Sequence, residues 1–156
     1  MELLEALGAW PGAAWLKRSG TAYMAVNAAH ILGLGLLVGA ILPLDLRLAG
    51  LIRGPALGAV APFLIRSAAV GLGLAALTGA WLFTVQPAVY LANPAFRWKL
   101  ALLVLALAVV AVQHAAPGFQ RALAGGRAGA RVRLTALASA LLWLGVLLAG
   151  RWIGFL

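Results

Sequence analysis

Long apolar stretches separated by short polar segments dominate this chain of 156 residues. Four such stretches lie at about 21–44, 62–85, 95–116 and 132–155. Each has about 20 residues or more, which is the length an α-helix needs to cross ~30 Å of hydrocarbon. Open-chain segments cross lipid as helices, because lipid offers backbone groups no hydrogen-bond partner. The pattern predicts an all-α fold, a four-helix transmembrane bundle formed by residues 21–156.

A shorter, amphipathic pattern precedes the first apolar stretch, within residues 1–20. Leu7 and Trp10 share one side of a helix, whereas Glu2 and Glu5 lie on another side. Tryptophan is enriched at the boundary between hydrocarbon and headgroups. We therefore expect an N-terminal interfacial segment that lies along the membrane surface. A frayed tail is the alternative.

Composition fits a lipid-facing surface. Hydrophobic residues make up 65% of the chain and charged residues 10%, against about 45–50% and about 25% in soluble domains. The net charge is +9, but the basic residues flank apolar stretches and form no basic-aromatic groove, so nucleic acid is not an expected partner. We expect the lipid bilayer as partner, with basic side chains on anionic headgroups. The absence of cysteine excludes disulfides, cysteine-ligated zinc and iron–sulfur clusters.

Basic residues also predict the orientation. The connections at 45–61 and 117–131 carry most of the arginines between spans: Arg47, Arg53, Arg121, Arg127 and Arg131. By the positive-inside rule this side is cytoplasmic. The chain is then expected in a bacterial cytoplasmic (inner) membrane with both termini outside. Basic residues on the outer side run against this prediction: Lys17, Arg18, Arg97, Lys99 and Arg151.

Small residues recur on the first two spans. Gly35 and Gly39 form a Gly-x-x-x-Gly pattern, and Gly71, Gly73 and Gly79 follow in the second span. Small residues let helix backbones approach closely in a membrane. They also leave room for a flat cofactor between helices. A glycine-rich face is in addition a candidate for pairing two copies into a homodimer.

His30 is the first candidate for chemistry, and it lies roughly 10 Å below the outer boundary at helical rise. Asn27 and Tyr23 share its helix face, which gives a polar stripe on an apolar helix. Ionisable groups at this depth usually face the bundle interior. A histidine there can ligate haem iron, bind copper or relay protons. The alternative is a neutral imidazole that is hydrogen-bonded to a neighbouring helix.

His114 lies at the inner end of the third span. Its expected depth differs from that of His30 by some 16 Å at helical rise. The two axial nitrogens of one haem must lie within about 4–5 Å of each other, since metal–nitrogen bonds are near 2 Å. A single haem clamped between His30 and His114 is therefore not expected. His114 is expected as an inner-boundary residue or as the ligand of a separate inner site.

The outer end of the third span carries two cations beside an indole, Arg97, Trp98 and Lys99. Lys99 lies at nearly the same depth as His30. Arg97 and Lys99 can pair with haem propionates or with another anionic group. The alternative is that both side chains extend to lipid phosphates.

Asp45 is the only acidic residue after Glu5 and stands at the inner mouth of the first span. We expect it to pair with Arg66 or Arg121 across the bundle, as a structural clamp at the inner surface. A proton or substrate gate is the alternative.

The run 22–33, which contains Tyr23, Asn27 and His30, and the run 44–48 around Asp45 together resemble an uncharacterised bacterial family of small four-helix membrane proteins. The segment 96–100 with Lys99 also fits. More distantly, a histidine in the first span and a lysine in the third are similar to CopD-like copper-resistance proteins and HemJ-type protoporphyrinogen oxidases. The latter likeness implies b-type haem, with His30 as the haem ligand and Lys99 as a partner near the site.

The leading hypothesis is a membrane protein that binds haem b in the outer half of the bundle and serves electron transfer or porphyrin oxidation. His30 is its axial ligand, Arg97 and Lys99 pair with propionates beside Trp98, and Asn27 and Tyr23 are polar supports. One alternative is a transporter for a metal ion or small solute. Another is a haem-free accessory subunit that packs on a partner.

Overall fold

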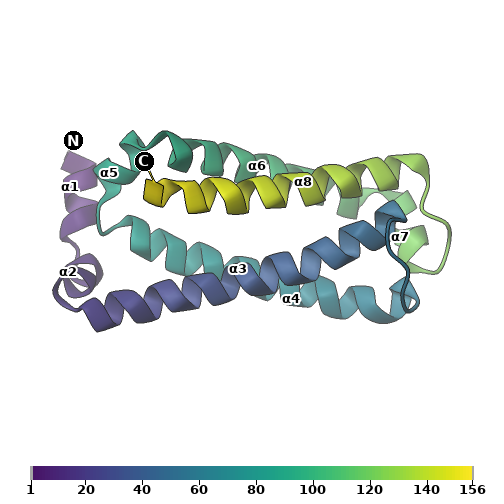
Figure 1. The fold of residues 1–156 in the computed structure, drawn as a ribbon, viewed down its shortest axis with the longest axis horizontal. Coiled ribbons are helices and arrows are strands. Elements are labelled where there is room, and N and C mark those ends of the chain that lie inside the picture. The colour runs from purple at the N-terminus through teal and green to yellow at the C-terminus, as the bar shows by residue number, and fades with distance from the viewer. Residues whose placement is uncertain (1, 156) are drawn as a thin grey trace.

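Four long helices run back and forth along one axis (Figure 1). They are α3 (Gly20–Ala49), α4 (Leu57–Phe83), α6 (Pro94–Ala115) and α8 (Ala130–Trp152), which continues into the 3-10 turn η1 (Ile153–Phe155). In this computed structural model, which describes residues 2–155, these four helices are long and apolar enough to cross a membrane. The described residues form no strand. The predicted all-α four-helix transmembrane fold is confirmed.

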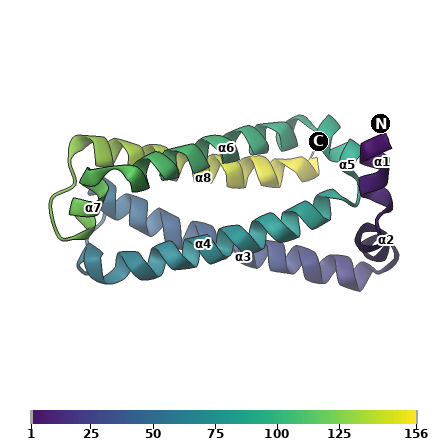
Figure 2. The same cartoon turned by 180° about the vertical axis from the view of Figure 1, so that it is seen from behind.

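Short helices cover the two ends of the bundle. At one end lie α1 (Glu2–Ala9), α2 (Pro11–Arg18), α5 (Pro87–Ala92) and both termini (Figure 1). At the other end lies α7 (Pro117–Leu123), as the reverse view in Figure 2 also shows. We call these the termini end and the α7 end.

The N-terminal segment is helical and docks on the termini end. Leu16 is 2% exposed and packs with residues of α3 and α4. The indole of Trp81 donates to the carbonyl of Gly12 at 3.1 Å, and that of Trp10 donates to the hydroxyl of Thr84 at 2.9 Å. These contacts exclude a frayed tail. The position of the segment at a membrane surface stays a prediction.

The first long helix runs farther than expected. It continues through Pro43 to Ala49, so Asp45 lies on the helix and not in a connection. An interior proline usually breaks or kinks a helix because it lacks an N–H. Here burial of the next turn holds it, since Leu48 is fully buried in a core cluster with residues of α4, α7 and α8. The helix ends at Gly50, whose φ of 80° suits only glycine.

The helices pack as two pairs. α3 lies along α4 and α6 along α8, and contacts between α3 and α8 join the pairs. The first pair is close-packed at Gly33 and Gly71. A Cβ atom at Gly71 would lie 2.5 Å from the Leu37 nitrogen, and one at Gly33 would lie 2.7 Å from the Ala75 nitrogen.

The Gly-x-x-x-Gly pattern itself is not a packing site. A Cβ atom at Gly35 or Gly39 would meet nothing within 4 Å, and both residues line a cavity. The sequence left two interpretations of the small residues open. Gly71 allows two helices to pack closely, whereas Gly35 and Gly39 leave room for a cavity. The homodimer stays a prediction.

Alanine substitution separates these two groups of glycines. Gly33→Ala and Gly71→Ala should lower the free energy of unfolding by about 1–3 kcal/mol, because a methyl group would meet backbone atoms of the partner helix. Gly35→Ala and Gly73→Ala are the controls, since an added Cβ meets nothing within 4 Å. Thermal unfolding in detergent measures all four variants. Equal losses in both groups would contradict the packing.

Candidate functional site

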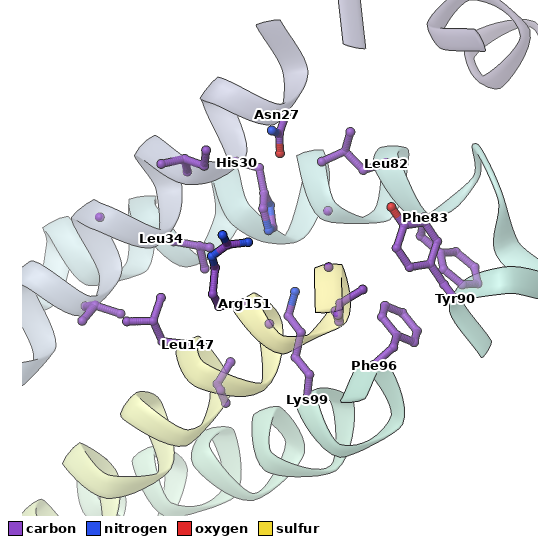
Figure 3. A pocket seen from close by; sticks show the side chains of 18 of the residues that line it. Asn27, His30, Leu34, Leu82, Phe83, Tyr90, Phe96, Lys99, Leu147 and Arg151 are labelled. Atoms are coloured by element: carbon purple, nitrogen blue, oxygen red, sulfur yellow. The ribbon is translucent and has the colours of Figure 1, made fainter. Parts of the chain in front are cut away.

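A cavity of about 670 Å³ opens between the two helix pairs near the termini end. Its lining comes from α3, α4, α5, α6, α8 and η1, so every long helix contributes (Figure 3). Its volume lies in the range of about 300–1,000 Å³ that is typical of ligand and cofactor sites. We call it the outer cavity, after the side of the membrane on which the sequence predicts it to lie.

His30 is the polar centre of the lining. Its Nδ1 lies 2.9 Å from the carbonyl oxygen of Ala75 and 3.1 Å from the hydroxyl of Thr78, both on α4. A carbonyl oxygen only accepts, so Nδ1 is the nitrogen that carries hydrogen. No hydrogen bond occupies Nε2 among residues 2–155. In metal-binding histidines one ring nitrogen commonly donates to a carbonyl and leaves the other for the metal.

Glycine provides the space in which the ring lies. A Cβ atom at Gly79 would be 2.9 Å from Cε1 of His30. The ring therefore packs directly on the α4 backbone. This contact and the bond to Ala75 orient the imidazole toward the cavity (Figure 3).

Two cations share the cavity with His30. The side chains of Lys99, from α6, and Arg151, from α8, extend toward the imidazole (Figure 3). The stem of Lys99 crosses Gly150, where a Cβ atom would lie 3.6 Å from its Cδ and Cε. No carboxylate is among the described residues that line the cavity. The cavity is therefore suited to an anionic ligand.

Aromatic rings form the wall of the cavity toward the termini end. Phe83 of α4 and Phe96 of α6 are stacked, with ring centroids 5.5 Å apart and an interplanar angle of 6°. Tyr90 of α5 lies 5.4 Å from Phe96, ring centre to ring centre. Burial and the neighbouring Tyr23 hydroxyl raise the pKa of Tyr90 to about 12. This wall is apolar, with hydroxyl groups at its rim.

The structure brings together four of the residues singled out from the sequence. Tyr23, Asn27, His30 and Lys99 all line the outer cavity. Arg151 joins them, although sequence reasoning had placed it only among the basic residues of the outer side. Its signal was its position near the end of the fourth span, at a depth that matches Lys99.

Arg97 and Trp98 lie outside the cavity. Both are exposed, Trp98 to 64%, and with Pro94 they line a separate surface depression. The physical reason is helix geometry, because residues two apart on a helix point in different directions. Lys99 faces inward, so Arg97 does not.

His114 is remote from the outer cavity. Its Nδ1 lies 2.9 Å from the Val110 carbonyl one turn back, and its ring packs on Phe119 at 4.8 Å. It does not line the cavity that contains His30. His30 and His114 therefore line different cavities.

Asp45 does not form the ion pair expected from the sequence. Its Oδ2 atom has no hydrogen-bond partner in the described part of the chain. Ser139 and Gln113 lie beside its carboxyl group, whereas Arg66 and Arg121 line other pockets. The expected clamp is wrong because α3 runs on as a helix and turns Asp45 into the bundle.

The described residues offer few side-chain ligands to a bare metal ion. Residues 2–155 contain no group of three or more His, Asp or Glu side chains that could hold one. A haem brings four nitrogen ligands of its own, so a single histidine suffices to anchor its iron. The residues around His30 therefore fit a haem better than a free ion.

The fold and this site define a four-span helical membrane protein with a cationic, aromatic-walled cavity near one end. Comparison of the chain with protein-family models, curated proteins and solved structures found no match. The likeness to the uncharacterised four-helix family and to CopD-like and HemJ-type proteins stays a prediction.

Titration of Tyr90 tests the wall of the cavity. A free tyrosine ionises near pH 10, whereas Tyr90 should hold its proton until about pH 12. Between these values the native state binds a proton that the unfolded chain has lost, so stability should fall as pH rises. Tyrosinate absorbance in wild type and Tyr90→Phe measures this, since the chain has two tyrosines. A Tyr90 that titrates near pH 10 in the folded protein would argue against a closed wall.

Proposed function

We propose that the outer cavity binds haem b, with Nε2 of His30 as an axial ligand to the iron. The observation that carries this proposal is the bond from His30 Nδ1 to the Ala75 carbonyl, which leaves Nε2 toward a cavity of cofactor size. Haem iron in proteins is commonly held by one such histidine. The bound group would supply one-electron redox chemistry, for electron transfer or porphyrin oxidation.

The charges of the cavity support the same ligand. Haem carries two propionates, and Lys99 and Arg151 are two cations without a carboxylate partner in the lining. Charge-assisted hydrogen bonds strengthen where water is scarce. Lys99 and Arg151, and not Arg97, are the proposed partners of the propionates.

The shape of the lining supports a flat ligand. Side chains are absent where several helices face the cavity, because the lining includes five glycines: Gly35, Gly39, Gly79, Gly150 and Gly154. The stacked rings of Phe83 and Phe96 add an apolar wall. Asn27 and Tyr23 supply polar atoms at the rim.

We further propose the cytoplasmic membrane of a bacterium as the location, with both termini outside. Four apolar helices make the chain a multi-pass membrane protein. The α7 end and its connections contain four arginines, Arg53, Arg121, Arg127 and Arg131. Their position supports that end as the cytoplasmic one. The outer cavity then lies near the opposite surface.

Absorption spectroscopy tests the proposed cofactor. Protein purified after haem-supplemented expression should show a Soret band, and His30→Ala should lose or strongly shift it. His114→Ala is the matched control, because it removes the other histidine of the chain and should leave the band unchanged. A haem-free wild type, or an identical band in His30→Ala, would sink the proposal. Saturable binding of a small organic anion by that haem-free protein would favour the transporter.

Affinity for haem tests the proposed propionate partners. Lys99→Gln and Arg151→Gln should each weaken binding by about tenfold or more, since a hydrogen bond to a charged group contributes roughly 1.5–3 kcal/mol. Arg97→Gln removes a cation of the same turn that lies outside the cavity, and it should bind as wild type. The titration is read from the Soret band of haem added to haem-free protein. Equal weakening in all three variants would point to general surface charge instead.

A further inference from the structure

A second group of polar side chains lies in the half of the bundle toward the α7 end. Asp45 of α3, Gln113 of α6 and Ser139 of α8 are 2%, 4% and 1% exposed. Trp143, one turn after Ser139, is equally buried. Three helices thus bring four polar side chains into one apolar core. We call this group the Asp45 cluster.

These side chains leave atoms unpaired. Oδ2 of Asp45, Oε1 of Gln113, Oγ of Ser139 and Nε1 of Trp143 are all buried without a hydrogen-bond partner in the described chain. An unpaired buried polar group costs about 1–3 kcal/mol. Buried polar atoms in native proteins are nearly always paired. Four unpaired atoms in one place therefore point to a bound species that completes the cluster.

The unpaired charge of Asp45 limits which species can be bound. An isolated carboxylate surrounded by apolar helices is unfavourable unless a proton or counter-ion neutralises it. A cavity of about 150 Å³ adjoins Asp45, Gln113 and Trp143, and neither Lys nor Arg is among its described lining residues. The one other titratable side chain in that lining is His114. Arg66, from α4, faces His114 in the adjacent pocket and does not line this cavity.

Donor and acceptor chemistry favours a proton. Oε1 of Gln113 only accepts, and Nε1–H of Trp143 only donates. A protonated carboxyl group supplies a partner for each of them. Its O–H donates to an acceptor such as Oε1 of Gln113, and its other oxygen accepts from an indole N–H. A metal cation would be repelled by the Trp143 N–H. One added proton therefore matches the cluster better than one added metal ion.

We propose that Asp45 is a proton-binding site inside the bundle that exchanges protons with the α7 end through His114. His114 lines the Asp45 cavity and also a pocket of about 520 Å³ beside Arg66, Phe119 and Gln120. Its Nδ1 is committed to the Val110 carbonyl, which leaves Nε2 to accept a proton. This site does not depend on what the outer cavity binds.

The transfer is balanced. Hydronium at the α7 end gives its proton to Nε2 of His114 and becomes water. The imidazolium then passes that proton, through water in the cavity, to the Asp45 carboxylate, which becomes a carboxylic acid. The cavity is larger than the roughly 15 Å³ that one ordered water needs.

Infrared spectroscopy of the protein in lipid bilayers tests this site. The chain has three acidic side chains, Glu2, Glu5 and Asp45, so the double variant Glu2→Gln/Glu5→Gln leaves Asp45 as the only side-chain carboxyl. Its protonated C=O stretching band should persist at pH 7, where exposed carboxyl groups are ionised. The band should disappear in Asp45→Asn. Because the double variant already isolates Asp45, the assignment does not require Asp45→Asn to fold.

Hydrogen–deuterium exchange of the same band tests the route. Transfer to D₂O should shift the band, and His114→Ala should slow that shift at least tenfold. Arg97→Gln is the control, since Arg97 lies in the opposite half and lines neither cavity, and exchange should be unchanged. A missing band at pH 7, or loss of the band on adding Na⁺ or K⁺ at constant pH, would overturn the proton site. An equal exchange rate in His114→Ala would overturn the route.

Discussion

Hydrocarbon offers a polar group no partner, so a polar side chain inside this bundle must find its hydrogen bonds within the protein. The bond from His30 to the Ala75 carbonyl is the contact on which the outer cavity depends. It requires α3 and α4 to lie close together, which Gly33 permits by packing on the Ala75 backbone one turn farther along. Close packing of α3 on α4 therefore permits the His30–Ala75 bond. That bond in turn fixes the tautomer of His30 and the direction of its free nitrogen.

The molecule keeps the side chains of opposite charge at its two sites in separate halves of the bundle and does not pair them. Lys99 and Arg151 share the outer cavity without a carboxylate in the described lining. Asp45 lies in the other half, and neither Lys nor Arg is in the described lining of its cavity. His30 and Asp45 are on the same helix, about 22 Å apart at helical rise. In these described linings, the outer cavity thus lacks an anion to pair with its cations, and the Asp45 cavity lacks a Lys or Arg to pair with its carboxylate. We interpret both as binding sites, for an anionic cofactor and for a proton.

The fold was predictable because solvent dictates it. Each apolar stretch must be helical in lipid whatever its neighbours are, so the four spans follow from local sequence. Tyr23, Asn27 and His30 were also predictable, since their spacing places them on one helix face. The prolonged first helix was not predictable from Pro43 alone, because burial of Leu48 among residues of α4, α7 and α8 decides it.

The other residues of the two sites come together because of how the helices are rotated against one another. Arg151 and the Phe83–Phe96 wall join His30 only because α4, α6 and α8 turn those faces inward. The same rotation leaves Arg97 outside. Gln113 and Ser139 lie on different helices, and no local pattern links either residue to Asp45. Pairings of this kind are properties of packing, so spacing within one helix does not reveal them.

The proposed haem site requires that His30 holds hydrogen on Nδ1 and presents an Nε2 without hydrogen to the outer cavity. Nitrogen-15 NMR of the imidazole in lipid bilayers tests it directly, with His114→Gln to leave one histidine in the chain. We expect a neutral ring with a protonated Nδ1 and an unprotonated Nε2. A neutral ring with hydrogen on Nε2, or an imidazolium with hydrogen on both nitrogens, would contradict it.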